Sequence, residues 1–220
     1  SGLPKAVLAA LIIDAVVFGM MDVPEMRRLR RVSRVDFWIA VAAIFGVLSA
    51  GVLAGVMFGI VLSIGWLIYI SVTPHMQVLG REPGTQVFRG VDDHPDYETY
   101  PGLLVLRFDA GLFFASADAL VDRLIDLHHQ ADPKLHTVVL DFEGVNFIDS
   151  QGADTLGEII ELATSRDIEL RLARLKTMVK EFLQRDGIVD RLGEGRIYGN
   201  VYEAAADKIP ATPKAPPGTG

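Results

Sequence analysis

The hydrophobic positions divide the chain into an apolar first third and a mixed remainder. Residues 37–80 form a run of 44 positions without an Asp, Glu, Lys or Arg. A membrane-spanning helix needs about 20 apolar residues, so residues 37–72 are too long for one pass and slightly short for two full passes. The pattern therefore predicts a tight helical hairpin that turns near residues 49–51, with arms at 37–48 and 52–72.

A third apolar stretch, residues 3–21, precedes the hairpin and is predicted to cross the membrane as well. A signal peptide is the competing interpretation, but the stretch has no basic leader and no A-x-A cleavage site. The missing initiator methionine indicates that more protein precedes Ser1. Five arginines lie within residues 22–36, and the positive-inside rule places that connecting loop in the cytoplasm. Counting passes from this loop places everything after residue 75 in the cytoplasm too.

Two features of the apolar third are candidates for function. A small residue recurs at every fourth position of the second arm, at Gly51, Gly55, Gly59 and Ser63. Such a stripe lets another helix approach closely, so we interpret it as a packing face, with a dimerisation seam as the alternative. Asp14 lies near the middle of residues 3–21, where a lipid-facing carboxylate is costly. We expect Asp14 to face protein or water, either coupling ion movement or pairing with a neighbouring helix.

Beyond the hairpin, short apolar strands alternate with amphipathic helices, which is typical of an α/β domain. Residues 76–102 contain several Gly and Pro and predict a linker leading into this domain, which spans 103–209. The predicted strands are residues 103–108, 112–115, 137–142 and 168–173. The predicted helices are 116–130, 150–164, 175–185 and 201–209. Residues 210–220 hold four prolines and predict a disordered tail.

Composition and charge narrow the classes of function. The mean hydropathy of +0.31 is high for an ordinary soluble domain, and the absence of cysteine excludes thiol catalysis and thiolate metal sites. The first 75 residues carry six basic and four acidic side chains, whereas the rest carry 15 basic and 24 acidic ones. This acidic remainder has no basic face for nucleic acid. His128 and His129 are adjacent on a predicted helix and point in different directions, which disfavours a shared metal.

The most specific local motif of the α/β part is a strand end that turns into a helix, residues 145–152 (VNFIDSQG). We predict that Asp149, Ser150, Gln151 and Gly152 form an exposed site for contact with a protein partner. Ser150 is also a candidate N-cap of the helix. No Gly-rich phosphate loop follows a strand, and no constellation indicates an enzyme or a bound cofactor.

Five segments of the apolar third and its exit form a distinctive set: 3–10 (LPKAVLAA), 33–37 (SRVDF), 51–63 (GVLAGVMFGIVLS), 74–75 (PH) and 79–81 (LGR). Taken together, they resemble the last membrane helices of the sulfate permease (SulP) family of anion transporters. Residues 108–115 and 145–152 resemble the STAS domain (sulfate transporter and anti-sigma-factor antagonist) that follows the membrane helices in that family. The short connection at residues 130–136 resembles bacterial members more than animal ones.

The resemblance implies that residues 1–75 are the last three helices of a homodimeric, multi-pass transporter in the inner (plasma) membrane. Its substrate would be an inorganic anion such as sulfate or bicarbonate, moved by symport and bound by half-helices upstream of this chain. The STAS domain would serve dimerisation and regulation. In anti-sigma-factor antagonists the serine after the turn aspartate is phosphorylated, and Ser150 occupies that place, with Gln151 replacing their usual second serine.

A second function is compatible with the same residues. The helices would then only tether a STAS signalling module, which would bind a partner protein under phosphorylation control. Three helices alone cannot enclose a transport pathway, which favours the interpretation as part of a larger transporter.

Overall fold

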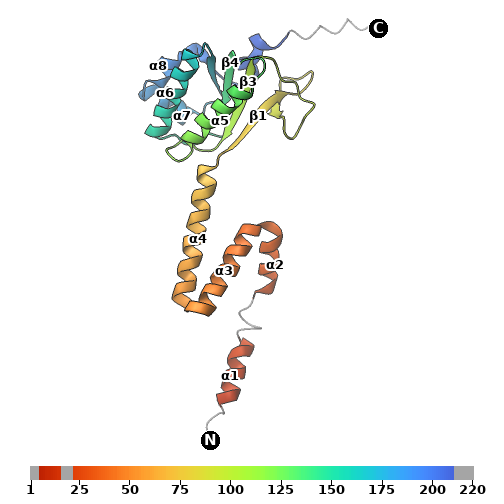
Figure 1. Ribbon diagram of the computed structural model, residues 1–220, viewed down its shortest axis with the longest axis vertical. Helices are drawn as coiled ribbons and strands as arrows, with labels where there is room; N and C mark the ends of the chain where they lie inside the picture. Colours follow the sequence, from red (N-terminus) through yellow and green to blue (C-terminus); the bar gives the residue numbers. More distant parts are fainter. Residues whose placement is uncertain (1–4, 16–21, 211–220) are drawn as a thin grey trace, which may run out of the picture. The chain divides into compact units, whose positions relative to one another are not determined.

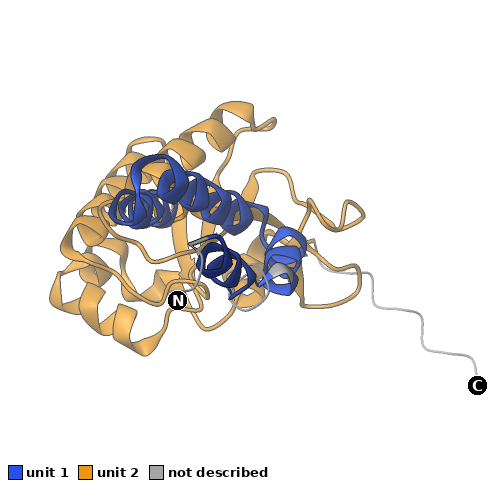
Figure 2. Ribbon diagram, turned by 90° about the horizontal axis from the view of Figure 1, so that it is seen from below, with its two compact units in different colours: residues 1–68 blue, residues 69–220 orange. Residues whose placement is uncertain are grey.

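The computed structural model describes residues 5–15 and 22–210, which form two compact units. Unit 1 covers Ser1–Ile68 and unit 2 covers Tyr69–Gly220 (Figure 2). The predicted tail, apart from Pro210, lies outside the described residues, and so does most of the second half of the predicted span at residues 3–21.

Unit 1 is helical, and its last helix continues into unit 2. The helices are α1 (Lys5–Asp14), α2 (Val23–Val32), α3 (Arg34–Ala50) and α4 (Val52–Val72) (Figure 1). The chain reverses between α3 and α4 at Gly51, within the predicted turn at 49–51. Gly51 has a φ of +89°, a backbone conformation that glycine adopts without the steric penalty of a Cβ atom. One residue is therefore enough to make the turn.

Glycines form the contact between α3 and α4. A Cβ atom on Gly46 would lie 3.0 Å from the Cα of Gly55, and one on Gly59 would lie 3.3 Å from the Cβ of Ala43. Gly55 and Gly59 thus pack against α3 of the same chain, whereas Ser63 is exposed. The middle of the small-residue stripe is a packing face within this chain.

Among the described residues, α4 is the one helix that is long and apolar enough to cross a membrane, judged by length and composition. The helix α3 has 17 residues and α1 has 10. Three membrane passes therefore stay a prediction.

The arginine-rich connector at residues 22–36 is not the loop that the sequence predicted. Most of it forms α2, because capping residues bracket a segment that contains good helix formers. The Asp22 side chain accepts a hydrogen bond of 3.0 Å from the backbone N–H of Glu25 at the start of α2. Ser33 ends α2, and its hydroxyl accepts a hydrogen bond of 3.3 Å from the N–H of Asp36 in the first turn of α3.

Unit 2 is built on a six-stranded sheet in the order β2-β1-β3-β4-β5-β6. The strands are β1 (His75–Arg81), β2 (Phe88–Gly90), β3 (Leu103–Asp109), β4 (Thr137–Asp141), β5 (Glu169–Ala173) and β6 (Ile197–Tyr198). Neighbours from β3 to β6 pair in parallel, and β1 pairs antiparallel with both β2 and β3. The α/β architecture predicted for this part of the chain is confirmed.

Helices cover the two faces of the sheet unequally (Figure 1). The larger core contains Leu104, Leu106 and Phe108 of β3. It is closed by the helices α5 (Ala117–Gln130), α6 (Ser150–Ser165), α7 (Thr177–Arg185) and α8 (Ile188–Leu192). Because side chains alternate along a strand, Val105 points to the other face, where α9 (Val201–Ala205) closes a smaller core.

Two sequence predictions at the start of this domain were wrong. Residues 76–102 are not simply a linker, since most of β1 and all of β2 lie there and β1 pairs with β3. Arg81 is buried at the end of β1, where it forms an ion pair with Glu98, and this buried charge hides the strand pattern. Residues 112–115, predicted as a strand, are a loop, in which Leu112 forms an isolated parallel bridge with Ile148 between β4 and α6.

Arg171 of β5 holds α9 and the turn that follows it against the sheet. Its buried guanidinium donates to the carbonyl of Ala204 at 2.6 Å, to Asp207 at 2.5 and 2.9 Å, and to Glu169 at 2.7 Å. The hydrogen bonds from Arg171 hold the pKa of Asp207 well below its ordinary value and also lower the pKa of Glu169. Both carboxylates thus favour the folded state when ionised.

This network predicts an acid-sensitive contribution to stability. Because the pKa of Asp207 is lower in the folded state, its stabilisation is complete above the unfolded-state pKa of about 4 and is lost as the pH falls below it. Asp207 is exposed, so we expect about 1 kcal/mol or less. Urea unfolding of wild type and Asp207→Asn should differ most near pH 7, and the difference should shrink steadily as the pH falls below about 4 towards the lower folded-state pKa. A difference that stays the same from pH 7 down to pH 2 would contradict this explanation.

Candidate functional site

The carboxyl ends of β3, β4 and β5 meet at one edge of the sheet, because these strands are parallel neighbours. In open α/β sheets this edge is where binding sites commonly form. The loop after β3, the β4–α6 turn and the β5–α7 connection all leave from it. The predicted motif at residues 149–152 belongs to the second of these connections.

Asp149 joins two of these connections and caps α6. Its Oδ1 accepts a hydrogen bond of 2.7 Å from the N–H of Gly152, and its Oδ2 accepts one of 3.3 Å from the N–H of Phe114. Backbone hydrogen bonds add to this: Leu112 N–H donates to Phe147 O at 2.9 Å and Asp149 N–H donates to Leu112 O at 3.2 Å. The β4–α6 turn is therefore fixed to the loop after β3.

Gly152 is required by the same close approach. A Cβ atom at this position would overlap the carbonyl group of Leu112, with its carbon only 2.7 Å away. Gly152 is buried, and it lets the first turn of α6 lie against the backbone of the preceding loop. Its role is structural.

Ser150 and Gln151 are both exposed on the first turn of α6. The prediction that Ser150 is the N-cap was wrong, because Asp149 holds that position and Ser150 is the first helical residue. Asp149 and Ser150 are both good capping residues, so composition did not distinguish them. Because Asp149 caps α6, the exposed hydroxyl of Ser150 does not serve as the cap.

We expect the two substitutions Asp149→Ala and Ser150→Ala to differ in cost. Asp149→Ala removes the cap and the bond to Phe114, and should lower the free energy of unfolding by about 1–2 kcal/mol. Ser150→Ala removes an exposed hydroxyl and should change it by less than about 0.5 kcal/mol. Thermal unfolding of the two variants measures this difference, and an equal loss in both would show that Ser150 shares the cap.

Large apolar side chains surround this turn. Phe114, Phe147 and Met178 expose 66%, 57% and 75% of their surface, and they follow β3, β4 and β5 respectively. The ring of Phe113 links two of them, with centroids 5.6 Å from Phe114 and 6.5 Å from Phe147. We name Phe114, Phe147 and Met178 the apolar rim. An open groove of about 360 Å³ is lined by Phe147 and by Met178 of α7. This edge of the sheet therefore combines a groove with exposed apolar side chains that a partner could contact.

A buried carboxylate supports this edge, and the sequence analysis missed it. Asp141, the last residue of β4, is completely buried. Its Oδ2 accepts from Nε of Arg107 at 2.8 Å, and its Oδ1 accepts from Nε of Arg174 at 2.8 Å and from the N–H of Glu143 at 3.2 Å. Arg107 of β3 and Arg174, the residue that follows β5, thus converge on it. The only sequence signal was an Asp directly after a run of apolar strand residues.

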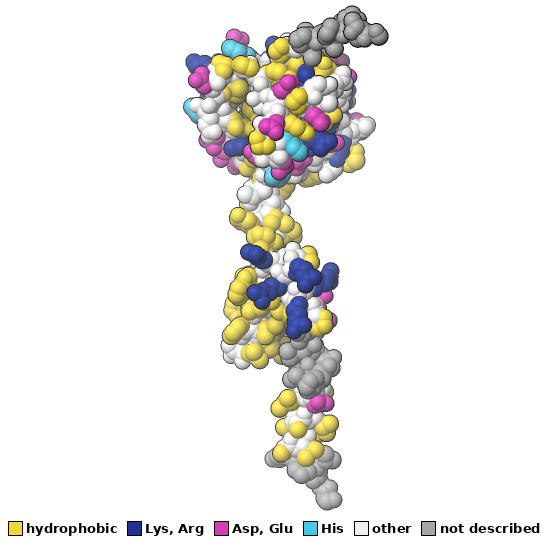
Figure 3. Space-filling view, turned by 90° about the vertical axis from the view of Figure 1, so that its right-hand side faces the viewer, with side chains coloured by type: hydrophobic (Ala, Val, Ile, Leu, Met, Phe, Trp, Pro, Cys, Tyr) yellow, Lys and Arg dark blue, Asp and Glu magenta, His cyan; other side chains and the backbone are white. Residues whose placement is uncertain are grey.

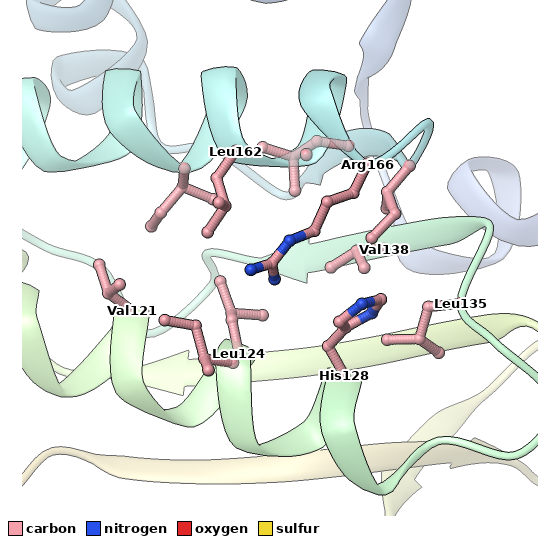
Figure 4. Close-up of a pocket in the computed structure, with 12 residues that line it drawn as sticks. Val121, Leu124, His128, Leu135, Val138, Leu162 and Arg166 are labelled. Carbon is pink, nitrogen blue, oxygen red and sulfur yellow. The ribbon is translucent and has the colours of Figure 1, made fainter.

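A small pocket lies between α5 and α6, away from this edge (Figure 4). It is lined by ten apolar side chains together with His128 of α5 and Arg166, which follows α6. Its cavity of about 40 Å³ has room for only a few water molecules. Burial lowers the pKa of His128, and electrostatic repulsion, most of it from Arg166, lowers it further. This lowering favours the neutral imidazole.

Metal binding has no geometric support in the ranges 5–15 and 22–210. Within them no group of three or more His, Cys, Asp or Glu side chains is placed to hold an ion. The rings of His128 and His129 are 6.0 Å apart at their centroids and inclined by 59°. Asp14, a predicted site residue of unit 1, is the last residue of α1, and its side chain is exposed.

Comparison with known proteins places the α/β unit in a family. The model of the STAS domain matches residues 94–204. Probable sulfate transporter 4.2 of Arabidopsis thaliana is 33% identical over 211 residues, covering 92% of this chain and 31% of that protein. Probable sulfate transporter MT1781 of Mycobacterium tuberculosis is 33% identical over 195 residues, covering 89% of this chain and 35% of that protein.

A solved structure agrees on the fold. The murine Solute Carrier 26 family member A9 anion transporter, in its inward-facing state, matches with a TM-score of 0.79 and 20% identity, over 94% of this chain and 34% of that one. The chain spans about a third of the length of the curated relatives that it matches. This chain belongs to the STAS-domain family and is a homologue of the SulP sulfate transporters.

Proposed function

We propose that this chain is the C-terminal part of a secondary anion transporter of the SulP family. The observation that carries the proposal is the extent of the similarity to sulfate transporters, which covers 92% of the chain and therefore includes the apolar helices as well as the STAS domain. A module that shared only the regulatory domain would match over unit 2 alone. The matched relatives are transporters and not enzymes.

We propose further that α1, α3 and α4 cross the inner (plasma) membrane and that the STAS domain lies in the cytoplasm. The apolar composition of the hairpin and the 21-residue length of α4 support the membrane passes. The exposed arginines of α2 support a cytoplasmic position for that helix. The hairpin would then return the chain to the cytoplasm before β1.

The transported anion would be sulfate or a related ion such as bicarbonate, and the residues that bind it would lie outside this chain. We propose that Asp14 contributes to ion coupling in a symport mechanism. A carboxylate within an apolar segment is costly and is usually retained for a functional reason. The homodimer is likewise a proposal, supported by the resemblance to SulP transporters.

Uptake of labelled sulfate into proteoliposomes that contain the full transporter tests the function. We expect saturable uptake that unlabelled sulfate suppresses and that an inward proton gradient stimulates. Asp14→Asn should reduce the stimulation by the gradient at least tenfold, whereas Asp36→Asn, an exposed aspartate on the first turn of α3, should leave it unchanged. Absence of saturable uptake of both sulfate and bicarbonate would contradict the transporter.

The alternative of a tethered signalling module is favoured by the apolar rim beside Ser150, which is suited to contact with a protein. A phosphate on Ser150 would meet the positive end of the α6 dipole and would change the charge presented to a partner without unfolding the helix. Ser150→Asp and Phe147→Ser distinguish the two functions. If they alter anion uptake, the rim regulates transport; if they alter only the capture of a partner protein, the signalling module is supported.

A further inference from the structure

Three arginines share one face of α2. Arg27, Arg30 and Arg31 stand at positions i, i+3 and i+4, which are neighbours on a helix surface. Met26 and Leu29, also three apart, lie on a different face and are half-buried. The basic side chains gather over this segment in the space-filling view (Figure 3). The helix is therefore amphipathic, with its cationic face turned to the surroundings.

These three guanidiniums lack partners in the part of the chain that the structure describes. Arg27, Arg30 and Arg31 are exposed, and none of them forms an ion pair or a side-chain hydrogen bond with a described residue. The two carboxylates at the start of α2 are engaged elsewhere: Asp22 caps α2, and Glu25 pairs with Arg28 at 2.8 Å. Fifteen planar N–H donors thus face outward from one helix surface.

The chemistry of this face selects phosphate. A guanidinium binds phosphate oxygens with two parallel hydrogen bonds, and a set of three can neutralise one or two anionic groups. The helix α2 directly precedes α3, a 17-residue apolar helix. Gly51 alone joins α3 to α4, the helix that is long and apolar enough to cross a membrane. Basic residues on an amphipathic helix next to a membrane segment commonly meet the headgroups of anionic lipids.

We propose that Arg27, Arg30 and Arg31 form a binding site for the phosphate headgroup of an anionic phospholipid. The site would hold α2 at the membrane surface by specific guanidinium contacts. If α2 acted only through its total positive charge, every arginine on it would contribute equally. If it forms a specific site, loss of an arginine of the site should weaken lipid binding more than loss of another arginine of the same helix.

Arg28 supplies the matched control for this distinction, because it lies on α2 but is already paired with Glu25. Wild type, Arg30→Gln and Arg28→Gln are each incorporated into vesicles of phosphatidylcholine with one-fifth phosphatidylglycerol. The chain is then extracted in mild detergent, and the phosphatidylglycerol that stays bound is measured by mass spectrometry relative to phosphatidylcholine. We expect Arg30→Gln to lower this enrichment about fivefold, the factor expected for one basic residue near an anionic surface, and Arg28→Gln to lower it less than twofold.

One further variant protects the test against loss of folding or orientation. Changing Arg27, Arg30 and Arg31 together to lysine keeps the charge but removes the paired hydrogen bonds, and should still lower the enrichment at least threefold. Equal losses in Arg28→Gln and Arg30→Gln, or full enrichment in the lysine variant, would overturn the site. Displacement of the lipid by 10 mM inorganic phosphate would overturn its assignment to a lipid headgroup.

Discussion

Replacing Asp141 with alanine should lower the free energy of unfolding of unit 2 by about 3–5 kcal/mol, because it leaves buried positive charge without its counterion. The carboxylate is completely buried and forms ion pairs with Arg107 of β3 and with Arg174, the residue that follows β5. Urea unfolding of the detergent-solubilised chain, followed by circular dichroism, measures the loss. The same substitution should loosen the edge that carries the β4–α6 turn.

Glu143 provides the control for Asp141, since it contacts the same two arginines from an exposed position. Its Oε2 lies 2.7 Å from Nη1 of Arg174 and 3.4 Å from Nη2 of Arg107. Solvent screens this pair, so Glu143→Gln should cost less than about 1 kcal/mol. Equal losses in the free energy of unfolding for the two substitutions would show that burial does not make Asp141 more important for stability than Glu143.

The second large effect is expected in the helical hairpin. In Gly55→Ala the new methyl group would overlap the backbone nitrogen and the side chain of Val47, and would lie 2.7 Å from its Cα. Backbone atoms cannot rotate away, so α3 and α4 must separate. Overpacking of this kind costs about 1–3 kcal/mol, and the loss of close contact between the two helices adds to it.

Tryptophan fluorescence reports on this hairpin selectively, because the two tryptophans of the chain, Trp38 and Trp66, lie on α3 and α4. The melting temperature observed by this signal should fall by several degrees in Gly55→Ala. Gly65→Ala is the matched control on the same helix, since a Cβ atom there meets nothing within 4 Å. A fall in Gly65→Ala as large as in Gly55→Ala would contradict the packing argument.

The hairpin and the parallel strands could be predicted because each has a strong local pattern. A charge-free run too long for one helix, broken at Gly51, leaves few alternatives to a turn at that residue. The buried strands β4 and β5 are short apolar runs between helices with a regular spacing of apolar residues. Local pattern and tertiary structure agree at these elements.

The missed features depend on contacts between distant residues. The strand β1 carries Arg81, a buried charge whose ion-pair partner Glu98 lies 17 residues further along the chain. Asp141 gains its importance from arginines 34 residues before it and 33 residues after it. The choice between Asp149 and Ser150 as the cap is decided by the approach of the loop at Leu112, which no local pattern encodes.

Labelling of single cysteines tests the central claim, a membrane hairpin followed by a cytoplasmic STAS domain, because the chain contains no cysteine of its own. The substitutions are Ala50→Cys beside the hairpin turn, Val32→Cys on α2 and Asp93→Cys in unit 2, all at exposed positions. In intact cells a membrane-impermeant maleimide should label position 50 alone, and positions 32 and 93 only after the membrane is opened. Labelling of position 93 in intact cells, or protection of position 50, would contradict the account.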